Sequence, residues 1–264
     1  GDVEFTANRI TSGNSSAPQK ENFIIKENSL SKENSLIKQN SNCILSIESP
    51  ASPGFQTVEI QENNSLSVKT NAYFGNVTND GNLKSAEGTT TSIMELINNN
   101  EVVIEGNLTI TDSATNSSSI TGSNQTNIPT GTPTNKEGAS VFLNGDTTIH
   151  TIENSGDANL SGNTNTITYF SNSGTFTPAE NSTLNIVSEI SNNDAGLFNA
   201  ENITVNITGP AGSIIGNGPE RTRFGTLSVN NSQTLSFSYD IYVKTLSLSG
   251  AGEDRRLTST STNP

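Results

Sequence analysis

The chain has 264 residues, of which 30% are hydrophobic, 5% aromatic and 15% charged, and it contains no tryptophan. A compact globular domain of this length buries more large apolar side chains, so the composition indicates either extensive disorder or a thin, repeated core. The formal net charge of −13 repels phosphate groups, which excludes nucleic acid as a partner and disfavours direct binding to an anionic membrane surface.

The first 111 residues contain short alternating segments without a regular repeat. Residues 56–70 (QTVEIQENNSLSVKT) and 100–110 (NEVVIEGNLTI) alternate apolar and polar residues, as strands with one buried face do. Residues 22–40 contain KENSL twice. Their spacing is compatible with an amphipathic helix, but the Asn and Ser content favours irregular strands or an edge segment. We predict irregular coils or a cap over residues 1–111.

Residues 112–137 (DSATNSSSITGSNQTNIPTGTPTNKE) are rich in Ser, Thr, Gly and Pro and poor in large apolar residues. Such a composition buries too little apolar surface to offset the entropy lost on ordering. We predict a flexible loop that leaves the folded core here, and a disordered tail over residues 251–264.

Residues 138–250 repeat a short Thr-rich strand. Its central apolar residue recurs at intervals of 18, 19, 19, 22 and 19, at Ile149, Ile167, Ile186, Val205, Leu227 and Leu246. A second column, formed by Ile152, Phe170 and Ile190, keeps step with the first, and each of its members is followed two residues later by Asn. Two columns in step indicate a structural repeat of about 19 residues.

A unit of this size cannot bury its own apolar face, but units stacked ~4.8 Å apart form a continuous core. The 38 asparagines suit such a stack, because Asn tolerates the left-handed backbone of sharp corners and forms hydrogen-bonded ladders when equivalent positions are superposed. We therefore predict an all-β fold, a right-handed parallel β-helix (β-solenoid). Tandem antiparallel β-sandwiches are the alternative.

The chain offers few residues for catalysis or for metal and cofactor binding. His150 is its one histidine and Cys43 its one cysteine, and neither lies in a motif of a nucleophilic or zinc enzyme. Pairs of carboxylates could act on a glycosidic bond only if they lie 5–10 Å apart; the candidates are Glu101 with Glu105, Glu59 with Glu62, and Glu253 with Asp254. We assign no catalytic, cofactor-binding or metal-binding residue and expect no cofactor.

The segments IENSGDANL, FSNSGTFTPAENSTLNI and EGNLTI resemble the coils of bacterial autotransporter passengers and filamentous-haemagglutinin-type adhesins. The resemblance covers residues 140–250 and, more loosely, 56–110. It implies a right-handed parallel β-helix exposed at the bacterial outer membrane, and it implies that the chain is a passenger fragment.

From this resemblance we expect a non-enzymatic, secreted or cell-surface protein that mediates adhesion or displays variable loops. Its partner would be a host-cell surface protein or glycan, and the fragment itself would be a monomer that does not insert into the membrane. Two alternatives stay open: a phage or S-layer structural protein, and a β-helical enzyme that degrades polysaccharide.

Overall fold

The computed structural model describes residues 62–229 except 64, 194, 210 and 211, together with residues 4–6, 21–25, 36–39, 43–47, 55–60, 235–238, 240–248 and 257–259. No helix occurs among these residues. The strands of the first half are β1 Glu4–Thr6, β2 Glu21–Ile25, β3 Leu36–Gln39, β4 Cys43–Ile47, β5 Phe55–Ile60, β6 Ser65–Val68, β7 Ala72–Asn79, β8 Asn82–Ser85, β9 Thr90–Asn98, β10 Glu101–Ile104, β11 Asn107–Asn116, β12 Ser119–Gly122 and β13 Thr126–Ile128.

Those of the second half are β14 Thr132–Asn135, β15 Ser140–Leu143, β16 Thr147–Asn154, β17 Asp157–Leu160, β18 Thr164–Asn172, β19 Thr175–Phe176, β20 Thr183–Asn192, β21 Leu197–Ile207, β22 Gly212–Ile215, β23 Thr222–Val229, β24 Leu235–Ser238, β25 Tyr242–Leu248 and β26 Leu257–Ser259. The elements are all strands because Thr, Val, Ile and Phe alternate with Ser, Thr and Asn in nearly every one of them.

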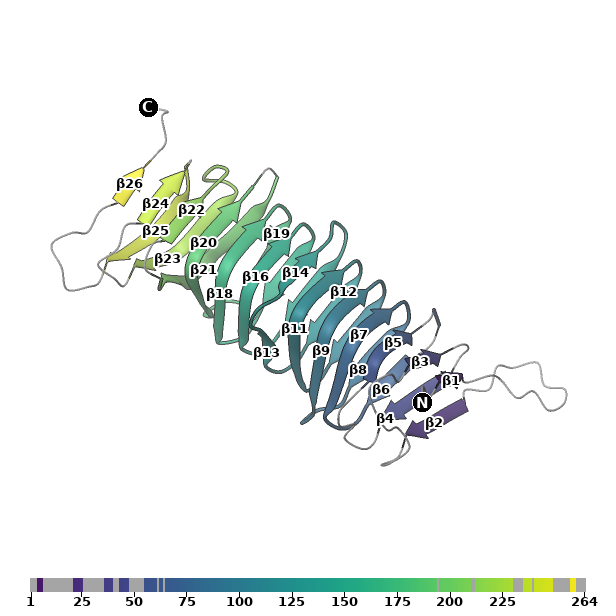
Figure 1. Cartoon of the computed structure of the whole chain (residues 1–264). Helices are drawn as coiled ribbons and strands as arrows, with labels where there is room; N and C mark the ends of the chain where they lie inside the picture. The colour runs from purple at the N-terminus through teal and green to yellow at the C-terminus, as the bar shows by residue number, and fades with distance from the viewer. Residues whose placement is uncertain are drawn as a thin grey trace.

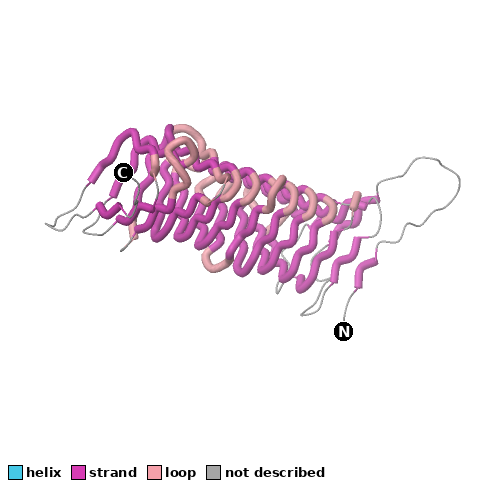
Figure 2. The backbone as a smooth tube through the Cα atoms, turned by 90° about the horizontal axis from the view of Figure 1, so that it is seen from above, coloured by secondary structure: helices cyan, strands magenta, loops and turns pink. Residues whose placement is uncertain are grey.

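Every strand pairs in parallel with the equivalent strand of the next coil, so the chain winds as a rod (Figure 1). The pairings fall into three faces. The first runs through β4, β6, β8, β10, β12, β15, β17 and β19. The second contains the N-terminal halves of β7, β9, β11, β16, β18 and β20, and the third their C-terminal halves. Figure 2 shows these coils from above.

The fold is thus an all-β parallel β-solenoid of about 9 turns, with coils of about 19 residues. This confirms the predicted stack of parallel coils and excludes tandem antiparallel sandwiches, because all pairings of the described strands are parallel. The solenoid needs few large side chains because each coil contributes only a few inward residues, and neighbouring coils cover them.

The core consists of inward columns that run along the rod. The predicted column Ile152, Phe170 and Ile190 is confirmed by the register. The first predicted column is right as far as Ile186, which pairs with Ile207; the predicted next member, Val205, pairs with Leu184 instead. Leu184 and Ile186 both point into the core from β20. A shift of two residues in the pairing therefore keeps apolar residues inward, and the intervals between apolar residues in the sequence do not reveal it.

The prediction of a flexible loop over residues 112–137 is wrong. The end of β11 and all of β12, β13 and β14 lie in this segment, and each pairs with the coils before and after it. Composition misleads here because Ala114, Ile120 and Ile128 supply the inward face while Asn and Thr fill the remaining positions. Of the predicted tail, only β26 lies within the described residues, and it pairs with β24.

A ladder of asparagines joins the coils at the end of the third face. In each coil the Asn Nδ2 donates a hydrogen bond of 2.7–2.9 Å to the Asn Oδ1 of the next coil. The ladder comprises Asn79, Asn98, Asn116, Asn135, Asn154, Asn172, Asn192 and Asn217. Its members up to Asn192 are at most 2% exposed, so the ladder is a polar column inside the rod.

The same amide groups also hold the corners of the coils. Nδ2 of Asn172 donates to the carbonyl of Gly174 in its own corner and to that of Leu197 in the next coil. Glycine at these corners allows close stacking, because a Cβ on Gly174 would overlap the carbonyl oxygen of Gly156 directly below it. The predicted left-handed role of Asn is rarer: among the described asparagines, only Asn63 and Asn181 have positive φ.

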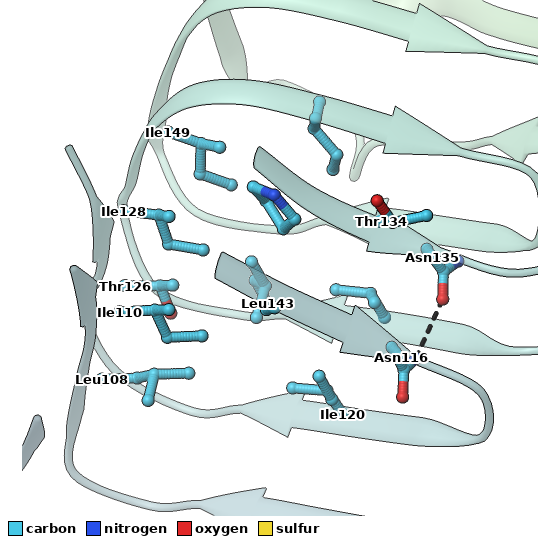
Figure 3. A pocket seen from close by; sticks show the side chains of 14 residues that line it. Leu108, Ile110, Asn116, Ile120, Thr126, Ile128, Thr134, Asn135, Leu143 and Ile149 are labelled. Carbon is cyan, nitrogen blue, oxygen red and sulfur yellow. Dashed lines mark hydrogen bonds between the residues drawn. The ribbon is translucent and has the colours of Figure 1, made fainter. Parts of the chain in front are cut away.

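One coil of the core is underfilled. A cavity of about 30 Å³ lies between Leu108, Ile128, Leu143 and Ile149, beside the hydrogen bond from Asn116 to Asn135 (Figure 3). It arises where Ala114 stacks under Pro133, in a column that has Leu96 in the preceding coil. Most of its lining residues are aliphatic, and Thr126, whose buried Oγ1 has no hydrogen-bond partner among the described residues, also lines it.

The ladder predicts a strong difference between two chemically identical substitutions. Asn172→Asp places a carboxylate opposite three oxygen acceptors, on Gly174, Asn192 and Leu197, and should lower the free energy of unfolding by at least about 3 kcal/mol. Asn185→Asp keeps its role as acceptor for Asn206 on the outer surface and should be nearly silent.

Denaturant unfolding of both variants tests this. The deficit of Asn172→Asp should shrink on acidification, because the buried carboxyl has a raised pKa and becomes a neutral donor once protonated. Equal losses in the two variants would contradict the structural role of the ladder.

The cavity predicts that Ala114→Val stabilises the solenoid by about 1 kcal/mol, because the added methyl groups fill empty apolar space. The matched control is Ala158→Val, at a site packed between Val141 and Phe176, which should destabilise the chain by about 1–3 kcal/mol. Thermal unfolding of the two variants measures both effects. A lower melting temperature for Ala114→Val would show that this coil has no room.

Candidate binding groove

A polar groove of about 520 Å³ runs along the corner between the first and second faces. It extends over successive coils, from the turn between β19 and β20 through β21 and β23 to β25. We call it the corner groove. Its lining comprises Glu180, Asn181, Glu201, Asn202, Ile203, Thr204, Gly225, Thr226, Lys244 and Thr245.

Local backbone features open this corner. Asn181 adopts a left-handed conformation, with φ of 64°, which turns the chain sharply before β20. In the next coil the register shifts between Ala200 and Thr204, so residues 201–203 form an irregularity that carries Glu201 and Asn202. Gly225 lies under this irregularity, where a Cβ would overlap the carbonyl oxygen of Glu201. The groove is therefore part of the coil geometry.

Thr204, Thr226 and Thr245 form one side of the groove. The three residues pair across consecutive strands, so their hydroxyl groups repeat at the strand spacing of ~4.8 Å along the axis. Within the described part of the chain, these hydroxyls and the Lys244 ammonium group have no hydrogen-bond or ion-pair partner. They are available to a ligand.

Carboxylates and amides of the turns form the other side. Glu180 is exposed and accepts a hydrogen bond of 3.4 Å from the amide of Asn202. Glu201 is held by Arg223, whose Nη2 lies 2.6 Å from Oε1 of the carboxylate. The two carboxylates thus differ, because only that of Glu201 is neutralised by a close cation.

Arg223 fixes the outer edge of this region. Besides Glu201 it contacts Glu220 at 3.2 Å, and its guanidinium group lies 4.6 Å from the ring centroid of Tyr242. The hydrogen bond with Glu201 and the neighbouring negative charges raise the pKa of Arg223, against the opposing effect of desolvation. Arg223 therefore stays charged and keeps Glu201 in place.

Behind the groove, the core is filled by aromatic rings. Phe176 and Phe198 stack with ring centroids 4.9 Å apart, and Phe224 follows at 5.3 Å from Phe198. All three are fully buried. Such contacts stiffen the coils that carry the groove residues, since aromatic pairs add to the free energy gained by burial.

The residues singled out from the sequence lie elsewhere. His150 is exposed on β16, next to Thr151 and 5.6 Å from the ring of Tyr169. Cys43 begins β4, and its side chain lies outside the described residues, as do Glu253 and Asp254. His150 does not line the corner groove.

Of the candidate carboxylate pairs, Glu101 with Glu105 and Glu59 with Glu62 lie within the described residues. Glu101 begins β10 and Glu105 follows its end, so their Cα atoms are about 13 Å apart at the rise of an extended strand. Glu59 lies within β5 and Glu62 in the turn beyond it. Glu180 and Glu201 were missed because they lie one coil apart, at an interval of 21, and become neighbours only through the stacking.

No group of three or more His, Cys, Asp or Glu side chains within the described residues is arranged to hold a metal ion. In the same part of the chain, no helix has the length and apolar character needed to span a membrane. No protein-family model matches the chain, and comparisons with curated proteins and with solved structures find no match.

The geometry predicts unequal coupling of Arg223 to its two carboxylates. The Glu201 side chain is 33% exposed and that of Glu220 is 89% exposed, so solvent screens the second pair more strongly. In double-mutant cycles with Arg223→Gln, measured by denaturant unfolding, Glu201→Gln should show the larger coupling energy, and that energy should survive added salt better. Equal couplings would indicate that the contact with Glu201 does not hold in solution.

Proposed function

We propose that the chain is a non-enzymatic, secreted or cell-surface solenoid of the autotransporter-passenger or haemagglutinin type, and that it attaches bacteria to a host-cell surface protein or glycan. The observation that carries the proposal is the corner groove, in which free hydroxyl, amide and ammonium groups line successive coils of a rigid stack. Groups fixed in this way can bind an extended partner with little loss of conformational entropy.

The chemistry of the groove supports binding over catalysis. Glu201 is occupied by Arg223, so it is poorly suited to give or take a proton during a reaction. The groove contains no histidine or cysteine that would act as a base or nucleophile. The net charge of −13 keeps the surface soluble and restricts partners to those that tolerate an acidic protein.

One observation favours a second candidate, a polysaccharide-degrading enzyme. Two carboxylates, Glu180 and Glu201, line the groove one coil apart, and hydrolysis of a glycosidic bond uses a pair of carboxylates. Incubation of the protein with polysaccharides, followed by measurement of the polysaccharide length, distinguishes the two functions. Shortened polysaccharides would contradict the non-enzymatic function and support the enzyme.

Attachment predicts that beads coated with the full chain bind cultured animal epithelial cells saturably and that soluble chain competes. Antibodies against the chain should label intact cells of the source organism, and external protease should remove the label. Beads coated with the unfolded chain are the control, because they carry the same net charge without the groove. Binding no better than that of the control, or an antigen protected from protease, would contradict the proposal.

A further inference from the structure

We propose that the corner groove binds a neutral glycan strand that lies parallel to the solenoid axis. The inference rests on the proposed attachment function and specifies its ligand. The juxtaposition that carries it is the row of free hydroxyls on Thr204, Thr226 and Thr245 opposite the carboxylates and amides of residues 180–181 and 201–202.

The direction of the ligand follows from the repeat. The hydroxyl groups of Thr204, Thr226 and Thr245 recur once per coil, at ~4.8 Å, on strands in continuous register. A linear glycan also presents hydroxyl groups at a regular interval, one set per sugar ring. A glycan that lies along the solenoid axis contacts one threonine per coil, whereas a glycan that lies across the axis would leave the groove after one coil.

The type of ligand follows from the donors and acceptors. Carboxylates and primary amides are planar groups that hydrogen-bond pairs of neighbouring hydroxyls, and Glu180, Asn181, Glu201 and Asn202 supply four of them. Lys244 donates to hydroxyl or ring oxygens. The volume of about 520 Å³ lies within the usual range for small-ligand sites.

Charge and composition argue against other ligands. Arg223 neutralises Glu201, and Glu180 offsets the charge of Lys244, so the groove has no excess of positive charge to attract uronic acids, sialic acids or phosphates. The chain as a whole carries a formal net charge of −13, which disfavours such anions, so we expect a neutral glycan. Among the described residues of the lining, Ile203 is the one aliphatic residue and is 4% exposed, and none is aromatic, so this part of the groove lacks the anchors that dominate protein interfaces. Without stacking on an aromatic ring, we expect affinity from hydrogen bonds alone, with a Kd on the order of 0.1–1 mM.

The test uses the full chain and defined hexasaccharides. Neutral probes are cellohexaose, maltohexaose, mannohexaose and N-acetylated chitohexaose, and the acidic probe is the hexamer of galacturonic acid. Saturation-transfer NMR and calorimetry should detect binding of at least one neutral probe and none of the acidic probe. Binding of no neutral probe, or tighter binding of the acidic one, would overturn the proposal.

Matched variants locate the site. Thr226→Val and Glu180→Gln should each weaken binding of the neutral probe at least tenfold while the melting temperature stays unchanged. The controls are Thr148→Val, on the outer surface of the same face, and Glu137→Gln, in an exposed turn; both should bind as the parent chain does. Equal weakening by the controls, or no weakening by the groove variants, would overturn the assignment to the groove.

Attachment and glycan binding can fail separately. If Thr226→Val abolishes binding of the probe and leaves attachment of beads to cells intact, the glycan site stands and the cell-binding surface lies elsewhere. If the variant abolishes attachment and no neutral glycan binds, the groove recognises something other than a neutral glycan, and this inference falls while the proposed attachment remains.

Discussion

The buried asparagine ladder is the constraint on which the rest of the solenoid depends. A primary amide has donors and an acceptor, so a stack of identical amides satisfies itself along the axis, and its second N–H closes the corner of each coil. An apolar residue at this position would leave corner carbonyls without donors, and a carboxylate would set acceptors against acceptors. The ladder therefore fixes the superposition of coils, and the apolar columns follow from it.

This constraint explains why so few large side chains suffice. Strand pairing and the ladder hold successive coils in register. Each inward column therefore needs only side chains that fit together, and these vary in size from that of Ala114 to that of Phe170. Repetition also tolerates local faults: the cavity beside Ala114 is lined by three successive coils, from Leu108 to Ile152, and does not extend further along the rod, because each coil contacts only its neighbours.

The class of fold, the length of the coil and the inward residues of the second half could be predicted from periodicity, because equivalent positions such as Ile152 and Phe170 carry the same signal in every coil. The order in residues 112–137 could not be predicted from composition, since Asn116 and Asn135 count as polar yet are buried. The corner groove escaped prediction for a different reason. Its carboxylates and amides lie at irregular positions of the coils, and a search for features common to all repeats does not detect residues that differ from the repeat.

The groove and the ladder are two uses of one stacking geometry. On the inside, identical side chains one coil apart satisfy each other, as Asn172 and Asn192 do. At the corner between the first and second faces, the irregularity at residues 201–203 and the turn at Asn181 open the coil beside Thr204, Thr226 and Thr245. These hydroxyl groups and the Lys244 ammonium group have no hydrogen-bond or ion-pair partner among the described residues. Regular coils also expose single hydroxyl groups, as Thr148 does, but the irregular corner places carboxylate, amide and ammonium groups beside them. The glycan site that we propose therefore lies where the repeat departs from its regular geometry.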